Sequence, residues 1–375
     1  MAALKRTLSR FVLLLAGLGA GVVGAEGVAR FAEVAQGREL LFPNGDGYPA
    51  DLYVMSDGIA YPNPEFSGEV RSVGYAVKPR FSPWGTRGDA TPGTPAWITV
   101  GDSFTAAVQV NDPDTFSARL QSNLGTPVVN AGVDGYSTWK ATMRYAQVAE
   151  HFPAEGAILG FFLGNDLFDN RNGIAPLGPD APGASPAPGR PPLHHNDMPP
   201  LLKLSPFERF LHDNSAAWAW YTVAQRQRAA ASGEDPRTRH FRDELELFGE
   251  RARQLVEQEI TDTRAALVQF REATQKRGHR AVVLVLPPAF TLTDEAARAT
   301  LSTFGVPSRT VDLTTAHDAV LRVAQEVGLE ACSPRDALVA AVNAGEAPYL
   351  LFDAHLSPRG HAIVADALAA CLAPK

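Results

Sequence analysis

Short, uninterrupted apolar segments alternate with helix-forming segments over most of the chain, and this alternation limits the fold more than any other feature. The apolar segments are residues 96–100, 127–130, 156–163, 281–286 and 329–332. Strands that are apolar on both faces are typical of a parallel sheet covered by helices on both sides. The sequence therefore predicts an α/β protein, a three-layer α/β/α sandwich around a parallel, doubly wound sheet of about five strands.

Helix-forming segments separate these strands, and one long insertion interrupts them. We expect helices at about 115–124, 137–151, 315–327, 334–344 and 358–370, and a helix over 243–276 that is too long for a globular domain unless it is kinked. Residues 171–200 contain nine prolines, so they cannot form a core element, whereas residues 205–232 look helical and aromatic. We predict that the insertion at about 171–240 forms a flap or cap over the functional site.

The N-terminus combines a positively charged start with an apolar run. Residues 5–10 (KRTLSR) precede the uncharged residues 11–25. This run is short for a membrane span but typical of a signal peptide, and residues 23–25 form an acceptable cleavage site. The alternative is an uncleaved inner-membrane anchor that continues through residues 26–31. Under both interpretations the rest of the chain is extracytoplasmic, that is, periplasmic or secreted.

The predicted organisation thus has three parts. Residues 1–30 form the signal peptide or anchor, and residues 31–95, rich in Gly, Pro and aromatic residues, form an irregular extension of loops and short strands. Residues 96–375 form the α/β domain with its insertion. Membrane attachment through the N-terminal segment is the one interaction with a cellular structure that this organisation suggests, and no protein partner can be inferred.

Charge and cysteine content exclude several classes of protein. The net charge is −7, from 34 Lys and Arg against 41 Asp and Glu, and no basic stripe is present, so we expect no nucleic-acid partner. Cys332 and Cys371 are too few, and wrongly spaced, for a metal site. In an oxidising compartment they could form a disulfide that closes a loop of about 40 residues; otherwise they are small buried hydrophobic residues. The sequence leaves both options open.

Four polar clusters follow apolar segments where ligands bind in open α/β sheets, beyond the carboxyl ends of the strands. They are residues 101–104 (GDSF), 130–132 (NAG), 164–166 (GND) and 353–357 (DAHLS). In a doubly wound sheet these clusters meet at one edge. The sequence therefore predicts a single functional site built from all four.

The chemistry that these residues allow is acyl transfer. A serine hydroxyl such as Ser103 is a weak nucleophile unless a base removes its proton, and His355 can be that base. Asp353 is two residues earlier, on the same side of an extended segment, where it can fix the imidazole tautomer. The developing oxyanion needs donors, and the backbone N–H groups of Ser103 and Gly132 and the side-chain amide of Asn165 could supply them. Gly132 also lacks a Cβ, which allows close approach of a substrate.

Other residues are weaker candidates for chemistry. His361 is a rival base, but it lies more than one turn into the last helix. His194, His195 and Asp197 form a metal-like cluster, yet two adjacent histidines cannot easily share one ligand face. Asp166 is better suited to a structural role. We therefore expect no metal and no cofactor.

The blocks GDSF, NAG, GND and a C-terminal DxH segment, in this order, resemble the SGNH/GDSL hydrolase superfamily. The resemblance covers about residues 97–365 without the proline-rich insertion, and it implies a flavodoxin-like sheet. It also implies Ser103 as nucleophile, Gly132 and Asn165 as oxyanion donors, and Asp353 and His355 as the rest of a triad. One residue separates Asp353 from His355, where many members have two. This closer spacing resembles the secreted and membrane-anchored bacterial branch and related polysaccharide O-acetyltransferases; a His–Ser dyad assisted by a backbone carbonyl is the alternative.

The leading functional hypothesis is a serine esterase that hydrolyses carboxylic esters through an acyl-enzyme on Ser103. Its substrate would be an acylated glycan, such as an O-acetylated envelope or extracellular glycan, or a lipid ester. An O-acyltransferase with the same triad and a non-catalytic interaction protein of the cell envelope are the alternatives.

Overall fold

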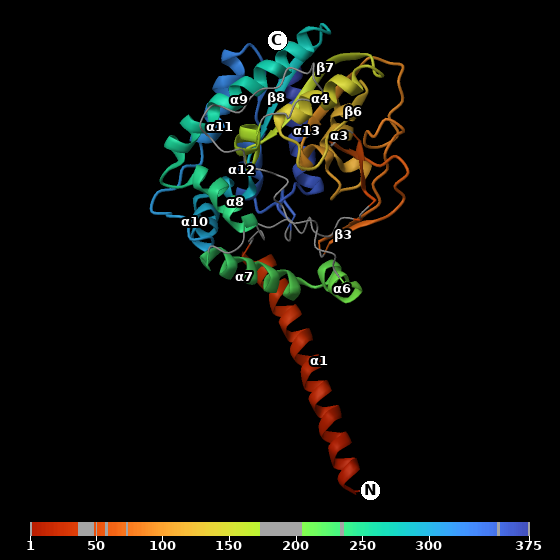
Figure 1. Cartoon of the computed structure of the whole chain (residues 1–375), viewed down its shortest axis with the longest axis vertical. Helices are drawn as coiled ribbons and strands as arrows, with labels where there is room; N and C mark the ends of the chain where they lie inside the picture. The colour runs from red at the N-terminus through yellow and green to blue at the C-terminus, as the bar shows by residue number, and fades with distance from the viewer. Residues whose placement is uncertain are drawn as a thin grey trace.

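The centre of the fold is a parallel sheet of five strands, seen in the computed structural model in Figure 1. The structure describes residues 2–36, 49, 51–56, 59–72, 74–172, 205–232, 236–350 and 353–373. The strands are β5 (Ala96–Gly101), β6 (Val128–Asn130), β7 (Ala154–Phe162), β8 (Arg280–Leu286) and β9 (Glu330–Cys332). They lie in the order β6-β5-β7-β8-β9, and every pairing is parallel. Counted along the core this is the order 2-1-3-4-5 of a flavodoxin-like sheet, so the predicted fold class is confirmed.

Helices cover both faces of the sheet because each strand exposes apolar side chains on both sides. One face packs against α4 (Thr138–Val148), α9 (Ala252–Gln275), α10 (Asp294–Thr303) and α11 (Thr315–Glu326). The other face packs against α3 (Phe116–Leu124), α12 (Arg335–Asn343) and α13 (Pro358–Leu372). The two faces carry separate apolar clusters, which gives the three layers that the sequence predicts.

The long helical segment predicted at 243–276 is broken, as expected for a segment of this length packed in a globular domain. The structure has α8 (Pro236–Leu245), the short 3-10 turn η5 (Glu246–Phe248) and then α9. Gly249 follows the turn, and its N–H donates to the carbonyl of Glu246 at 3.2 Å. The break sets α8 at an angle to α9, so α8 can reach the edge of the sheet where the strands end.

Short elements join the larger ones. These are α2 (Ser103–Ala106), α5 (Asp166–Asp169), α6 (Pro206–Asn214), α7 (Ala216–Ser232) and the 3-10 turns η2 (Asp112–Asp114), η3 (Asn170–Asn172) and η6 (Ala289–Leu292). The helices predicted for 205–232 are thus present as α6 and α7. The proline-rich part of the insertion, 173–204, lies outside the described residues.

The extension before the α/β domain contains short strands, as the sequence predicts. It contains two antiparallel hairpins, β1 (Tyr53–Ser56) with β2 (Ile59–Pro62) and β3 (Val70–Ser72) with β4 (Tyr75–Val77). Arg87 is buried and forms an ion pair with Asp112 at 2.6 Å. Its guanidinium also donates to the carbonyl oxygens of Ala106, Ala107 and Val110. The extension is therefore fastened to the end of α2.

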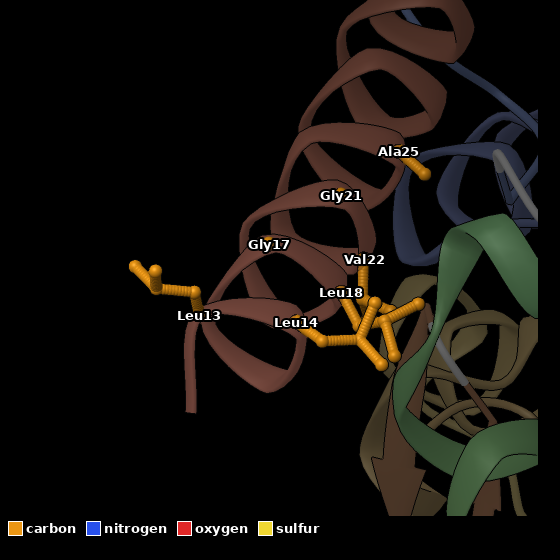
Figure 2. A pocket seen from close by; sticks show the side chains of 7 residues that line it. All are labelled: Leu13, Leu14, Gly17, Leu18, Gly21, Val22 and Ala25. Atoms are coloured by element: carbon orange, nitrogen blue, oxygen red, sulfur yellow. The ribbon is translucent and has the colours of Figure 1, made fainter. Parts of the chain in front are cut away.

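The N-terminal helix α1 (Ala2–Gln36) projects from the domain as a single rod (Figure 1). Its stretch Val12–Phe31, 20 residues, is long and apolar enough to cross a membrane, and almost none of it is buried in the protein. A signal sequence would meet the same description. Figure 2 shows a shallow apolar groove on this helix, where Gly17, Gly21 and Ala25 lie one turn apart between leucine and valine side chains.

A polar joint at Glu26 fixes α1 to the start of α7. The Glu26 carboxylate accepts hydrogen bonds from the backbone N–H groups of Ala216 at 2.9 Å and Ala217 at 3.0 Å. It also accepts from Ser215 Oγ at 2.8 Å and from Arg30 Nε at 2.6 Å. A carboxylate at the N-terminus of a helix also interacts favourably with the helix dipole.

Cys332 and Cys371 form a disulfide across a sequence separation of 39 residues. The bond joins β9 to α13 and answers the question that the sequence leaves open. A loop of this length corresponds to a stabilisation of about 3–4 kcal/mol if the entropy of the unfolded chain is the main contribution.

Candidate active site

The structure brings the four polar clusters together at the carboxyl edge of the sheet. Ser103 begins α2 directly after β5, and Gly132 follows β6. Asn165 follows β7, and the segment with Asp353 and His355 lies just before α13. The order of the strands reverses between β5 and β7, and such a switch point is where ligands bind in doubly wound sheets.

Ser103 is placed by a tight turn between β5 and α2. Gly101 has φ of 152°, and a Cβ at this position would lie 2.6 Å from the carbonyl oxygen of Gly160. Asp102 caps the helix, with its Oδ1 accepting from the N–H of Phe104 at 3.0 Å. Ser103 therefore occupies the first position of α2, where its N–H has no acceptor within the helix.

The Ser103 hydroxyl lies against the histidine that the sequence pairs with it. Ser103 Oγ is 2.8 Å from His355 Nε2. His355 is 5% exposed, and Phe104, itself stacked on Phe162 with 3.7 Å between ring centroids, lies 4.8 Å from the imidazole centroid. The aromatic side chains exclude water from one side of the imidazole, while Nε2 faces the serine.

Asp353 holds the other side of the imidazole. One carboxylate oxygen, Oδ1, accepts hydrogen bonds from His355 Nδ1 and from the backbone N–H of His355, the latter at 3.0 Å. Burial on its own raises the pKa of Asp353, but the interaction with His355 outweighs it and holds the pKa below its usual value. Burial lowers the pKa of His355, but the Asp353 carboxylate outweighs it, so this pKa is raised. With Nδ1 protonated toward Asp353, Nε2 is free to accept the serine proton.

A tyrosine that the sequence analysis did not single out completes this arrangement. Tyr75 of β4 donates from its hydroxyl to Asp353 Oδ2 at 3.1 Å. It comes from the extension, 278 residues before Asp353, and no local pattern marks it. The β3-β4 hairpin is therefore part of the site.

The predicted oxyanion donors lie at the same edge, but two of them already donate within the protein. The N–H of Gly132 donates to Asn130 Oδ1 at 3.0 Å, and Asn165 Nδ2 donates to Asp169 Oδ2 at 3.0 Å. The NH₂ group of Asn165 has a second hydrogen, so the bond to Asp169 orients the amide and leaves one hydrogen to donate to an oxyanion. The single hydrogen of Gly132 must leave Asn130 to serve an oxyanion.

Gly132 is also required for the packing of its loop. A Cβ on this residue would lie 2.4 Å from the backbone nitrogen of Ala106 and 2.6 Å from the carbonyl carbon of Thr105. The loop after β6 thus packs directly on the backbone of α2. Because Ser103 begins α2, this contact ties the positions of Gly132 and Ser103 together.

Three buried carboxyl groups surround the start of α2. Asp166 Oδ2 accepts from the N–H of Phe162 at 2.7 Å, which agrees with the structural role expected for it. Burial raises the pKa of Asp102 to about 7 and that of Asp166 well above its usual value, and Asp169 adds to both shifts. The sequence shows each aspartate but not their proximity.

The rival base His361 does not take part in this arrangement. His361 is buried, and its Nδ1 accepts from the N–H of Phe116 at 3.2 Å, so it holds the start of α3. Burial lowers the pKa of His361 to about 3. His194, His195 and Asp197 lie outside the described residues. Within the part of the chain that the structure describes, no group of three or more His, Cys, Asp or Glu could hold a metal ion.

Comparison with known proteins finds similar solved structures only. No family model and no curated protein matches the chain. A protein from Desulfitobacterium hafniense, described as lipolytic and of the G-D-S-L family, is 13% identical, with 74% of this chain and 99% of that chain covered and a TM-score of 0.37. An acetylxylan esterase from Geobacillus stearothermophilus is also 13% identical, with 76% and 96% covered and a TM-score of 0.37. A protein from Slackia heliotrinireducens, described as an SGNH hydrolase, is 12% identical, with 75% and 100% covered and a TM-score of 0.37.

Proposed function

We propose that this chain is a serine esterase of the SGNH/GDSL superfamily that cleaves carboxylic esters through an acyl-enzyme on Ser103. The observation that carries the proposal is the continuous chain of contacts from Ser103 Oγ through His355 to Asp353. A serine, a base within hydrogen-bond reach and a third group that orients the base are the arrangement that nucleophilic catalysis requires. They lie at the switch point of a doubly wound sheet, where a substrate can reach them.

In the first half of the reaction, Ser103 Oγ attacks the ester carbonyl carbon while its proton passes to His355 Nε2. The carbonyl bond pair moves to oxygen, and the resulting oxyanion accepts hydrogen bonds from the N–H of Ser103 and the amide of Asn165. When this intermediate collapses, the bond to the leaving oxygen breaks, and that oxygen takes the proton from His355. The acyl group remains on Ser103.

In the second half, water repeats the sequence. The oxygen of a water molecule attacks the acyl carbon while His355 takes a proton from that water. The bond to Ser103 Oγ then breaks, Ser103 recovers a proton from His355, and the carboxylic acid leaves. The Asp353 carboxylate stays ionised throughout and stabilises the imidazolium that forms in each half. Acyl transfer to a sugar hydroxyl would follow the same steps with an alcohol in place of water.

For the substrate we propose an acylated glycan or lipid ester outside the cytoplasm. The positively charged residues 5–10 precede the apolar stretch of α1, which favours a cytoplasmic N-terminus and an extracytoplasmic domain. Figure 1 shows the domain at the far end of α1 from these charges.

Active-site labelling tests the proposal directly. The full chain should bind a fluorophosphonate covalently and release p-nitrophenol from p-nitrophenyl acetate, whereas Ser103→Ala should do neither while its Tm stays nearly unchanged. Thr105→Ser, a hydroxyl in the same helix, is the matched control and should keep both activities. Labelling that persists in Ser103→Ala would refute the nucleophile, and absence of labelling in the wild-type chain would indicate an interaction protein. A panel of acetylated glycans, with acetate release and acetyl transfer both measured, separates hydrolase from acyltransferase.

A further inference from the structure

Helices α6 and α7 carry an unusual set of exposed aromatic side chains. Phe207 is 68% exposed, Phe210 is 60% exposed and Tyr221 is 53% exposed, while Trp220 is 37% exposed. Phe207 and Phe210 are three residues apart on α6 and so lie on the same side of that helix. Trp220 and Tyr221 lie on α7, which begins two residues after α6 ends, so two consecutive helices each expose large aromatic side chains. Exposed apolar side chains in such numbers often mark a surface that something covers. We refer to these four side chains as the aromatic surface.

The joint between α1 and α7 places this surface at a defined height along α1. Glu26 caps the first turn of α7, and Arg30 donates to the carbonyl of Asn214 at the end of α6 at 2.9 Å. Both residues lie in the last part of the apolar stretch Val12–Phe31. The uncharged residues 11–25 end directly before Glu26, and Arg30 lies one turn further along the helix. The joint therefore places the aromatic surface at the level where charged residues follow the apolar run and α1 would leave the hydrocarbon.

The carboxyl edge of the sheet points to the same end of the molecule. Helix α6 packs against β3, β3 pairs with β4, and Tyr75 of β4 binds Asp353. Beyond the end of β8, Phe290 packs on Phe248 of η5, which follows α8. Figure 1 shows α6, α7 and β3 gathered where α1 enters the domain. The Ser103 site and the aromatic surface thus lie at the same end of the domain, the end where α1 enters it.

We propose that the aromatic surface inserts into the headgroup region of the bilayer that α1 spans, and that the Ser103 site consequently faces this bilayer. Tyrosine and tryptophan favour this region because one part of the side chain is apolar and the other polar, and phenylalanine adds apolar area. A short amphipathic helix such as α6 can lie flat in the interface. The substrate presented to such a site is an ester carried at the membrane surface by a lipid. This inference rests on the proposed function only in its statement about the substrate.

Depth-dependent quenching tests the position of the surface without any measurement of activity. Both native cysteines are in the disulfide, so Phe207→Cys and Tyr221→Cys each add one thiol that an environment-sensitive fluorophore can label. Gln275→Cys, at the end of α9 beside the start of β8, is the control at the opposite edge of the sheet. The labelled full-length chains are reconstituted into vesicles of phosphatidylethanolamine and phosphatidylglycerol.

The labels at 207 and 221 should be quenched by lipids that carry a doxyl group near the headgroup and protected from iodide in the buffer, and the label at 275 should behave in the opposite way. Equal iodide quenching at all three positions, with no quenching by the lipids, would overturn the proposal.

A second comparison tests the consequence for the substrate. The variant Phe207→Ser/Phe210→Ser/Tyr221→Ser should cleave water-soluble p-nitrophenyl acetate as the wild type does, because none of these residues touches the site. Its cleavage of a fluorogenic ester embedded in the vesicles should fall by about tenfold or more. An unchanged ratio of the two rates would overturn the membrane-facing site. If the wild type cleaves neither ester, the proposed function fails, whereas the quenching result still decides the position of the surface.

Discussion

Replacing Asp353 with asparagine removes the negative charge that faces His355 and leaves one oxygen atom to accept hydrogen bonds. The carboxylate now serves three donors: His355 Nδ1 and the His355 backbone N–H on Oδ1, and the Tyr75 hydroxyl on Oδ2. If the amide oxygen faces His355, its NH₂ group can donate to the Tyr75 oxygen, and only the charge is lost. If the amide is reversed, NH₂ faces Nδ1 and forces the proton to Nε2, where it blocks transfer from Ser103.

The expected loss in kcat is on the order of 10⁴, because the variant either lacks the charge that stabilises the imidazolium or holds the wrong tautomer. At 1.36 kcal/mol for each factor of ten, this corresponds to about 5–6 kcal/mol of transition-state stabilisation. The pH profile should also move. The carboxylate raises the pKa of His355 and burial lowers it, so loss of the charge lowers this pKa. Because the base must be neutral, the acid limb of kcat/KM should shift to lower pH.

Stopped-flow release of p-nitrophenol from p-nitrophenyl acetate across the pH range measures both effects. Asp134→Asn is the matched control, since Asp134 also raises the pKa of His355 but through space. It should move the acid limb in the same direction while costing far less rate. If Asp353→Asn keeps kcat within a factor of about ten of wild type, orientation by the carboxylate is wrong, and a backbone carbonyl must do this instead.

Three further predictions address neighbouring groups. Asn165→Ala should lower kcat by about 10²–10³ with little change in KM, as expected for loss of one oxyanion donor, and a loss seen only in KM would contradict this. Tyr75→Phe removes a donor to the ionised carboxylate, so kcat/KM should fall by up to about tenfold, with an unchanged Tm separating positioning from stability. Asp102→Asn keeps an N-cap acceptor but cannot ionise. The pKa of Asp102 is raised to about 7 by burial, so the folded state binds the proton more tightly and stability falls as pH rises from about 4 to 7. The variant should therefore lose less stability than wild type between these pH values in urea unfolding, and parallel curves would contradict the shift.

Much of the fold follows from the local pattern. Each of the five core strands lies within two residues of its predicted range, because parallel strands buried on both faces read as continuous apolar runs. The break in the predicted helix at 243–276 agrees with the expectation that a helix of this length in a globular domain is kinked. The pairing of the two hairpins of the extension was not predicted, since strands of three or four residues carry little periodicity.

The site divides in the same way. Residues that directly follow strands, such as Ser103 and Asn165, are predictable because strand ends meet at one edge of the sheet. Tyr75 is not, because its contact with Asp353 joins segments that share no local pattern. The bonds that occupy the N–H of Gly132 and the amide of Asn165 depend on loop conformations, which spacing alone does not determine.

The joint at Glu26 makes the link between α1 and the domain stiff rather than a tether. Four donors, the Arg30 guanidinium, the Ser215 hydroxyl and two backbone N–H groups of α7, hold the Glu26 carboxylate. If α1 stays in the membrane as an anchor, a domain held in this way cannot tumble; it can only diffuse in the plane of the membrane with α1 and turn about the axis of the helix. Its encounters with a substrate are then set by the number of substrate molecules per unit area and not per unit volume. For such an enzyme, adding lipid that is not a substrate would lower the surface density of the substrate and slow the reaction, whereas adding buffer would not.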